Sequence, residues 1–553
     1  MQNVQYVDSV TTVSALMFMV QKLCDHIEFR KFINSQLRWD PLQWKTAPGL
    51  LAEALIMNTL FGRDALYKVE EFYEKIDTET LFGEGISHEN FNDDAFAALL
   101  DRIHEANPKK LFSLFVFNAL KHEDIFFESI HADTTSISLT GEYKEQQESA
   151  INVTFGHTKD HRPDLKQVML GLIATKDGLP IFAEPLDGNK ADSTWNKEVL
   201  NQIDDILYGD RARTLIYTAD SSLITLDNLK VIEKKKLNFV SRLPGRFLLE
   251  EELKDLAWSN PEKWEDLGKF ANYKKASSYY GQDLYARLGG RLYRFIVLRS
   301  DRMDIRKSRK IDDMLSKEKN QLAKEIAKLE KEEFNCRIDA EKALKNFHSK
   351  HANSNHKLTG TVIETHTEKR ERGRPKKGSL PEIIVTYKVK VQIIEPNQEA
   401  IDQMKAKASS FVIMTNLLQT RGWTAKKVFR EYKDQVHVER NFRFLKDPQL
   451  TGGIFVDKPH RIGALVILFT MAAFIATILQ RRVRLALEKS QDTLRLVGGV
   501  KTRKPTSKRL LELLHENMVV CYKTGNESMR LWVKPNDNLA KVFKYGGIPL
   551  PKP

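Results

Sequence analysis

An uninterrupted apolar run late in the chain constrains the fold more than any other feature. Residues 462–479 read IGALVILFTMAAFIATIL, which is 18 residues without a charge. Such a run is either a short membrane span or a helix enclosed by a large protein core. Basic residues flank both ends, so the flanks indicate no sidedness. The run stands alone in a chain of mean hydropathy −0.43. We therefore expect a buried core helix and no membrane partner, with a single-span membrane protein as the alternative.

The overall composition describes a globular and basic protein. Hydrophobic residues make up 41% of the 553 residues, which excludes global disorder. At about 150 residues per domain, this length predicts three or four domains. The net charge of +13 at pH 7 favours a polyanionic partner, of which nucleic acid is the commonest. A basic chain can also be merely soluble, so charge alone does not assign DNA binding.

Cysteine usage and the first residues indicate the compartment. Cys24, Cys336 and Cys521 lie far apart and form no CxxC pair. This spacing argues against a disulfide framework and a zinc site, and it fits a reducing cytosol. The N-terminal stretch lacks the basic start and small-residue cleavage site of a signal peptide. We therefore expect a cytoplasmic protein.

The pattern of apolar residues changes several times along the chain. Residues 1–128 show three- and four-residue spacing, which predicts a helical N-terminal domain. Residues 129–243 alternate short β-branched runs with helical ones, which predicts an α/β sheet. A similar pattern returns over 406–490, with a helix expected from Ala425 to Leu445. The basic segment 491–553 predicts a helix with loose ends.

Residues 244–405 interrupt the α/β pattern with high charge density and weak apolar periodicity. A helical stretch from Lys307 to Phe347 carries an apolar seam of under three heptads, which favours a helical hairpin over a coiled coil. Two strand-like runs follow, LTGTVIETHT and EIIVTYKVKVQII, with the loop EKRERGRPKKGSLP between them. The block predicts an α+β insertion within the core.

Two aspartates follow strand-like runs. Asp133 follows the run that ends in SIHA, and Asp220 follows TLIYTA. Functional sites in open α/β sheets usually form where strands end. Most aspartates at such positions are solvated surface groups, so placement alone is a weak indication of function.

A third acid has a more informative context. If residues 425–445 form one helix at 100° per residue, one stripe about 80° wide holds five different side chains: Tyr432, Gln435, Glu439, Phe442 and Lys446. A core stripe would not bury a glutamate and a lysine, and a solvated face would not need the two aromatic rings. The alternative is an ordinary amphipathic helix in which Glu439 and Arg443 form an i,i+4 pair.

At this point the residues resemble the DDE transposases of bacterial insertion sequences, in the branch with a Y-x2-R-x3-E-x6-K signature. All spacings are kept by Tyr432, Gln435, Glu439 and Lys446. Gln435 departs from the pattern because it is neutral and cannot form the ionic fork that arginine makes with a phosphate. Arg440 and Arg443 are candidates to compensate.

The two aspartates extend this resemblance. HADTT around Asp133 and YTADSS around Asp220 look like the first two strand motifs of the family. The acids are separated by 87 and 219 residues, and the family's β-rich insertion would produce the longer gap. The resemblance covers about residues 90–490.

The resemblance implies an α/β fold: an RNase H-like core, with a mixed sheet flanked by helices, interrupted by the insertion. It also implies a two-metal site in which Asp133 bridges two Mg²⁺ ions and Asp220 and Glu439 each hold one, with Mn²⁺ as a substitute. Two such ions about 3.5–4 Å apart activate the nucleophile and stabilise the leaving oxygen in phosphodiester cleavage. Mg²⁺ prefers carboxylate and phosphate oxygens, and converging carboxylates need such cations to offset their repulsion.

The implied partner is double-stranded DNA, both the terminal inverted repeats and the target, bound by a homodimer in the bacterial cytoplasm near the nucleoid. In this family Tyr432 and Lys446 would contact phosphates of the transposon end. The sequence adds a basic loop that looks like an AT-hook, in which extended arginines can enter a narrow minor groove: Arg372, Arg374, Lys376 and Lys377. A solvated basic turn is its alternative.

Further basic segments accompany the core. Lys501, Arg503, Lys504, Lys508 and Arg509 form a cluster that could follow backbone phosphates. The run KDHRPDLKQ (159–167) predicts a loop beside the first catalytic strand. The alternatives to a transposase are a related two-metal nuclease that cuts without joining, and a catalytically silent, domesticated DNA-binding protein.

Overall fold

The computed structural model describes residues 9–62, 64–123, 125–143, 151–160, 162–206, 215–270, 277–302, 305–369, 382–396, 398–446, 456, 458–524, 527–533 and 537–550. The chain forms two compact units. The first comprises Met1–Pro244 and Thr415–Pro553, and the second comprises Gly245–Met414.

The first unit begins with a group of helices: α1 (Ala15–His26), α2 (Phe29–Gln36), α3 (Pro48–Phe61), α4 (Val69–Glu74), α5 (Thr78–Phe82), α6 (Asp93–Glu105) and α7 (Pro108–His122). Polar caps begin several of them. The Ser14 hydroxyl accepts a hydrogen bond from the Met17 amide, and the Asn92 side chain accepts one from the Ala95 amide. Asn107 caps α7, with Pro108 at its first position.

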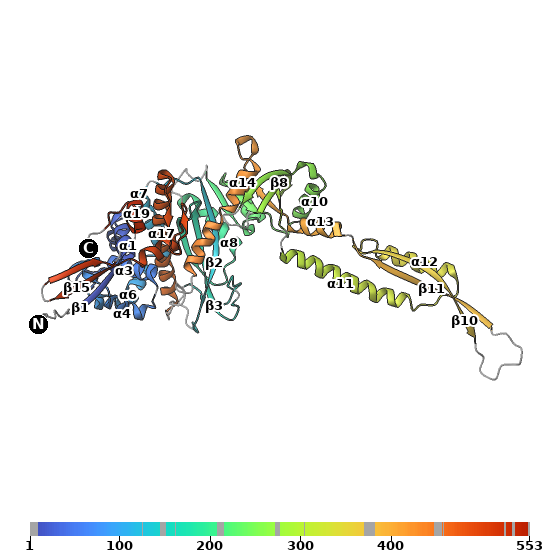
Figure 1. Cartoon of the computed structure of the whole chain (residues 1–553), viewed down its shortest axis with the longest axis horizontal. Coiled ribbons are helices and arrows are strands. Elements are labelled where there is room, and N and C mark those ends of the chain that lie inside the picture. Colours follow the sequence, from blue (N-terminus) through green and yellow to red (C-terminus); the bar gives the residue numbers. More distant parts are fainter. Residues whose placement is uncertain are drawn as a thin grey trace. The chain divides into compact units, whose positions relative to one another are not determined.

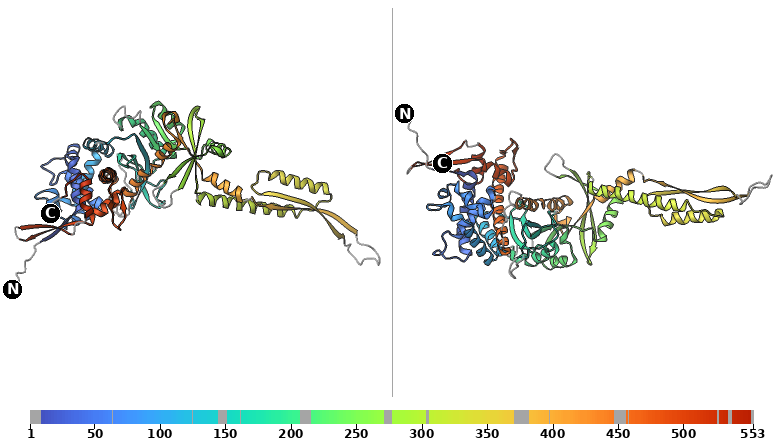
Figure 2. Two further views of the ribbon diagram at one scale, coloured as in Figure 1. Left: turned by 45° about the horizontal axis from the view of Figure 1, so that its top comes forward. Right: turned by 90° about the horizontal axis from the view of Figure 1, so that it is seen from below.

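The apolar run lies in the long helix α17 (Pro459–Ser490). Among the described residues, this is the one helix long and apolar enough to cross a membrane, and its most apolar 18-residue window is wholly buried within the protein. Helix α17 contacts α3, α6 and α7 as well as strand β4 (Pro180–Leu186). Figure 2 (right) shows it between the N-terminal helices and the sheet. The expected buried core helix is thus confirmed.

The sheet of the first unit follows these helices (Figure 1). Its strands lie in the order β4-β3-β2-β5-β6. Strands β2, β3 and β4 pair antiparallel, whereas β5 and β6 run parallel to β2. Besides β4, the strands are β2 (Ser129–Leu139), β3 (Lys166–Thr175), β5 (Ile216–Ala219) and β6 (Asn238–Arg242). The expected mixed α/β sheet is therefore present.

Helices cover both faces of this sheet. Helices α8 (Asp192–Ile206) and α9 (Leu226–Lys234) pack together, and α8 contacts β2. Helices α14 (Ala425–Lys433) and α15 (Val436–Leu445) contact the sheet from their own side. The prediction of one helix from 425 to 445 is wrong, because the chain turns at Asp434 and Gln435. There the amides of Gln435, His437 and Val438 bond to carbonyls three residues back instead of four.

The C-terminal segment is more ordered than expected. Strand β15 (Met518–Thr524) pairs antiparallel with both β16 (Glu527–Trp532) and β1 (Ser9–Ser14). The remaining elements are β13 (Leu494–Arg495), β14 (Lys501–Thr502), α18 (Ser507–His515) and α19 (Asp537–Tyr545). The prediction of loose ends is wrong because the segment completes a sheet with β1, a strand that the helical pattern did not predict.

The second unit contains a run of hydrogen-bonded strands and a helical hairpin on a β-ribbon. These strands lie in the order β12-β9-β8-β7. The expected helical hairpin is formed by α11 and α12, whose buried residues share a core with β10 and β11. The elements are α10 (Leu248–Trp258), β7 (Glu265–Phe270), β8 (Ser277–Leu288), β9 (Arg291–Ser300), α11 (Ile305–Leu329), α12 (Arg337–Lys350), β10 (Lys357–Lys369), β11 (Glu382–Ile394), α13 (Gln398–Ser409) and β12 (Phe411–Thr415).

Candidate active site

Two acids lie where the parallel pairing of β2 and β5 ends. The last register pair is Ala132 with Ala219. Strand β5 stops there, whereas β2 continues to Leu139. Asp133 directly follows Ala132, and Asp220 directly follows Ala219. They are therefore neighbours at the point where the parallel pairing ends. The strand-end prediction is confirmed for Asp220, which follows β5, and is wrong for Asp133, which lies within β2.

Both acids face the helices α14 and α15. His131 and Thr218 are register partners two residues earlier on the same strands. The His131 Nε2 atom is 3.1 Å from Glu431 Oε1 on α14, and the Thr218 hydroxyl donates to the same oxygen at 3.4 Å. Side chains two residues apart on a strand share a face. Asp133 and Asp220 therefore point to the side of the sheet that α14 covers.

Asp133 lies in a confined and negatively charged environment. The pKa of its carboxyl is raised to about 7, mainly by burial. Asp220 and Asp192 contribute to the rise, whereas Lys159 acts in the opposite direction. Acids that crowd one another in this way favour a bound cation.

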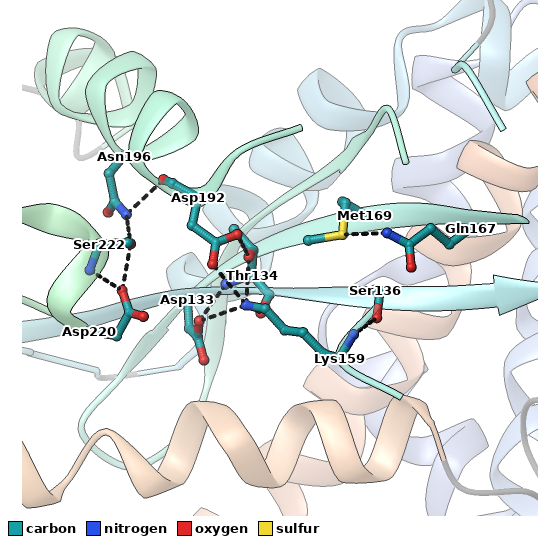
Figure 3. A network of polar contacts seen from close by, with 10 residues as sticks. All are labelled: Asp133, Thr134, Ser136, Lys159, Gln167, Met169, Asp192, Asn196, Asp220 and Ser222. Atoms are coloured by element: carbon teal, nitrogen blue, oxygen red, sulfur yellow. Dashed lines mark hydrogen bonds and ion pairs between the residues drawn. The ribbon is translucent and has the colours of Figure 1, made fainter. Parts of the chain in front are cut away.

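A lysine and a third aspartate complete this cluster (Figure 3). The Lys159 Nζ atom is 3.6 Å from Asp133 Oδ1 and 3.1 Å from Asp192 Oδ2. It also donates hydrogen bonds to the carbonyl of Thr134 at 2.7 Å and to its hydroxyl at 3.0 Å. The Thr134 hydroxyl in turn donates to Asp192, the first residue of α8. Lys159 belongs to the loop expected beside β2; of the predicted range 159–167, Lys166 and Gln167 instead begin β3, and residue 161 lies outside the described residues.

Asp220 is fixed by a local turn. Its carboxylate accepts hydrogen bonds from the Ser222 amide at 3.0 Å and from the Ser222 hydroxyl at 2.5 Å. Asn196 of α8 donates to that hydroxyl at 3.1 Å and accepts a hydrogen bond from buried Tyr217 at 2.7 Å. Burial raises the pKa of Tyr217, as do Asp220 and Asp133, so its hydroxyl stays a donor. These contacts orient Asp220 before any ligand is present.

Glu439 lies in the first turn of α15, and its side chain is 54% exposed. Its Oε2 atom is 3.7 Å from Arg443 NH2, so the i,i+4 pair considered above is present. Tyr432 connects this acid with the two aspartates electrostatically. Burial raises the pKa of Tyr432, Arg242 lowers it, and Asp220, Glu439 and Asp133 each raise it further. All three acids therefore lie within electrostatic range of one phenol.

Lys446 lies at the end of α15, beside β2. Its ammonium pairs with the carboxylate of Asp160, which also accepts hydrogen bonds from Ser136 and Ser138 of β2, both at 3.4 Å. Burial lowers the pKa of Lys446, against the effect of Asp160. The structure thus places Lys446 next to the Asp133 cluster, because its partner Asp160 directly follows Lys159 in the loop.

The other residues expected to contact DNA occupy different environments. Gln435 is buried at the turn between α14 and α15, at 9% exposure. Arg443 is exposed, and Arg440 NH1 lies 3.5 Å from His437 Nδ1. Arg372, Arg374, Lys376 and Lys377 lie outside the described residues.

Arg440 belongs to a crowded cationic group. Burial, together with Arg440 and Arg484, lowers the pKa of His437 to about 3, so that its imidazole is neutral near pH 7. Burial also lowers the pKa of Arg484 to about 10, with Arg440 adding to the effect. Cations that depress one another's protonation in this way favour an anionic ligand.

Sequence reasoning missed a buried polar group under the acids. Glu431 is 4% exposed and His131 is fully buried. Burial raises the pKa of Glu431, but His131, Ser129 and Lys176 lower it more, so the net shift is downward. Lys176 also lies 3.3 Å from Asp434 in the turn between α14 and α15. The contacts join residues more than 250 positions apart, so no local pattern could have indicated them.

The donor chemistry at Asp133 and Asp220 fits a divalent ion. Carboxylate oxygens are ligands that Mg²⁺ prefers. The pKa of Asp133 is raised mainly by burial and further by Asp220 and Asp192, and a bound cation would offset both effects. Within the part of the chain that the structure describes, no three His, Cys, Asp or Glu side chains converge closely enough to hold a metal ion. The predicted third ligand, Glu439, therefore does not converge with Asp133 and Asp220 among the described residues.

Comparisons with known proteins give limited similarities. A family model described as a domain of unknown function (DUF4277) matches residues 9–117. No curated protein sequence matches the chain. The chain is similar to the piggyBac transposase synaptic complex with hairpin DNA at a TM-score of 0.38 and 8% identity, over 92% of this chain and 82% of that one. It is similar to the pre-cleavage Mos1 transpososome at a TM-score of 0.15 and 12% identity, over 36% and 60%.

Proposed function

We propose that this protein is a DNA transposase of the DDE type that cuts and joins DNA strands with divalent ions held by Asp133, Asp220 and Glu439. One observation carries the proposal. Asp133 and Asp220 end the pairing of adjacent parallel strands and face the helices that carry Tyr432 and Glu439. The strand order β4-β3-β2-β5-β6, with its antiparallel and parallel pairs, supports an RNase H-like core around this site.

Two Mg²⁺ ions, or Mn²⁺ in their place, would supply the activation of the attacking hydroxyl and the stabilisation of the leaving oxygen. Asp133 would be shared between the ions, while Asp220 and Glu439 would each hold one. Asp220 is already oriented by Ser222. Glu439, whose side chain is 54% exposed and lies 3.7 Å from Arg443, would turn toward the aspartates to hold its ion.

The same helices would hold the DNA end. Lys446 would exchange its carboxylate partner Asp160 for a phosphate, and Tyr432 would donate its hydroxyl to one. The cations Arg440 and Arg484, which lie beside the neutral imidazole of His437, support phosphate binding in place of the arginine that Gln435 replaces. Because Gln435 is buried, its contribution would be to shape the turn as well as to contact DNA.

The biological setting follows from the same proposal. The protein would belong to a bacterial insertion sequence and act in the cytoplasm, at the nucleoid. It would bind terminal inverted repeats and target DNA as a homodimer, since two ends must be joined together. Residues 1–128 would contribute to recognition of the ends, and the insertion with its basic loop would add phosphate contacts.

Strand cleavage at the element's inverted repeats tests the proposal. With Mg²⁺, the wild-type protein is expected to cut at the repeat ends and join them to target DNA. Asp133→Ala, Asp220→Ala and Glu439→Ala should each lower the rate by about a hundredfold or more, since even outer-shell changes cost 10–100-fold at metal sites. Asp227→Asn and Glu488→Gln are matched controls on exposed surface of α9 and α17, and should keep wild-type rates.

The alternatives give different results in the same assay. A related nuclease would cut without joining, and a silent DNA-binding protein would bind the repeats without cutting. Wild-type activity that survives one of the three alanine substitutions would remove that acid from the site.

A further inference from the structure

Lys159 places a positive charge inside the acidic cluster. Its Nζ atom lies 3.1 Å from Asp192 and 3.6 Å from Asp133. Two hydrogen bonds to Thr134 fix its position. Figure 3 shows the ammonium between the two carboxylates. The lysine thus occupies the kind of position that a small cation would take.

The cluster needs such a charge. Asp220 and Asp192 both act on Asp133, and the side chains of Asp133 and Asp192 are only 18% and 25% exposed. Removing the partner of a buried charge is strongly unfavourable because the remaining charge is neither solvated nor paired. A protein that meets divalent ions only part of the time therefore requires a substitute cation in their absence.

The contacts that attach the loop to β2 hold the backbone of Lys159 and its neighbour Asp160, and they are different from the contacts of the Lys159 ammonium. The Lys159 amide donates to the Ser136 hydroxyl at 2.9 Å. The next residue, Asp160, is held by Lys446 and by Ser136 and Ser138. These contacts do not involve the ammonium, and the Lys159 side chain is 30% exposed. The side chain can therefore leave the cluster while the loop stays on β2.

We propose that Lys159 is a built-in counter-ion: it holds the carboxylates of Asp133 and Asp192 together in the metal-free protein and yields its place when divalent ions bind. The identity of the ions as catalytic cofactors rests on the proposed function. The exchange itself does not, since it depends only on the acids and the lysine. Asp192 is then a positioning residue, which receives the lysine at the start of α8.

Mn²⁺ binding to the full-length protein without DNA tests the exchange, followed by the electron paramagnetic resonance of the free ion. Lys159→Met removes the competing charge and should tighten Mn²⁺ binding by about tenfold, the order expected of one partly buried charge pair. Lys159→Arg keeps the charge and should bind Mn²⁺ like the wild type. Lys190→Met is the matched control, since Lys190 pairs with Glu198 of α8 at 2.6 Å.

Thermal unfolding gives a second readout. In EDTA, Lys159→Met should unfold at a lower temperature than the wild type, and Mg²⁺ should raise its unfolding temperature by more than it raises that of the wild type. Lys159→Gln, which can still hydrogen-bond the Thr134 carbonyl, provides the same comparison if the methionine variant does not fold.

The outcomes separate this inference from the proposed function. Equal or weaker Mn²⁺ binding by Lys159→Met would overturn the counter-ion role, whatever the protein does to DNA. Tighter binding that disappears in the double variant with Asp133→Asn would support it, even if no DNA were cut. Binding unaffected by Asp133→Asn would overturn it, because the ion would then lie elsewhere.

Discussion

Gly171 determines how closely α8 approaches the sheet. It lies on β3 as the register partner of Thr134. A Cβ atom at this position would lie 2.3 Å from the indole of Trp195, which is fully buried and donates to Glu184 at 3.0 Å. The absence of a side chain therefore lets α8 bring Asp192 to Thr134.

Gly171→Ala should destabilise the first unit. Overpacking of a dense core costs about 1–3 kcal/mol, and the rigid indole has no flexible end that could yield. We expect a lower unfolding temperature in calorimetry. Gly245→Ala is the control, because a Cβ there meets nothing within 4 Å. Equal unfolding temperatures for the two variants would contradict this account of the packing.

Glu431 links the strands of the two aspartates to α14. In Glu431→Gln, fully buried His131 loses its charged neighbour. Leaving buried polar groups poorly satisfied costs about 1–3 kcal/mol. Chemical denaturation at pH 7 should show this loss, whereas Glu488→Gln on exposed surface should show almost none. An unchanged midpoint for Glu431→Gln would mean that the contact contributes little.

At the scale of elements, α6 and α17 are tied by one acid. Asp101 accepts hydrogen bonds from Arg461 at 2.6 and 2.7 Å, and His460 Nε2 lies 2.8 Å from it. Burial would raise the pKa of Asp101, but Arg461 and His460 lower it to about 2. A carboxyl whose pKa is lower in the folded state stabilises the protein above its ordinary pKa of 3.8.

This sign predicts a pH-dependent difference for Asp101→Asn. The variant should unfold at a lower temperature than the wild type above pH 4. The difference should shrink as the pH falls from about 4 to about 2, where the wild-type carboxyl takes up its proton. Glu105→Gln, in an exposed pair with Arg102 on the same helix, should show little effect at any pH. A difference that grew on acidification would contradict the assignment.

Local patterns predicted the elements but not their junctions. Runs of β-branched residues that end at an acid predicted β2 and β5, and the uninterrupted apolar run over 462–479 predicted α17. The single helix expected over 425–445 is interrupted at Asp434 and Gln435, where Lys176 lies 3.3 Å from the Asp434 carboxylate. Asp192 and Lys159 are distant from Asp133 in sequence and come close to it only in the folded protein. The sequence therefore predicted a loop at Lys159 but not the contact of its ammonium with the two aspartates. Long-range contacts of this kind leave no periodic signal.

At the scale of the whole molecule, the composition shift near Pro244 lies beside the start of the second compact unit at Gly245. Within that unit, α11 and α12 form a core with β10 and β11. The strand pattern indicated the ribbon because its two runs flank a basic loop. The end of the insertion was predicted at residue 405, whereas the second unit ends at Met414. Charged helices have little apolar periodicity, so the sequence pattern marks their ends poorly.

The basic loop gives a prediction for DNA binding. Changing Arg372, Arg374, Lys376 and Lys377 together to alanine should weaken binding and lower the slope of log affinity against log salt by up to about 3–4, at roughly 0.9 per phosphate contact. Fluorescence anisotropy over a salt series measures both quantities. The control removes equal charge from exposed positions of α11 and α12: Lys317, Lys324, Lys328 and Lys342. Equal slopes for the two quadruple variants would contradict a specific role for the loop.

The pairing of β1 with β15 has a consequence for protein synthesis. One edge of β1 finds its partner early, because Thr12 bonds to the backbone of Lys75 and Asp77. The other edge pairs with Met518–Thr524. At 5–20 residues per second, the ribosome needs roughly half a minute to two minutes to reach that strand. Until then, the edge of β1 that pairs with β15 lacks its partner strand. Its unpaired N–H and C=O groups could bind other strands, and a chaperone that covers this edge would prevent such pairing.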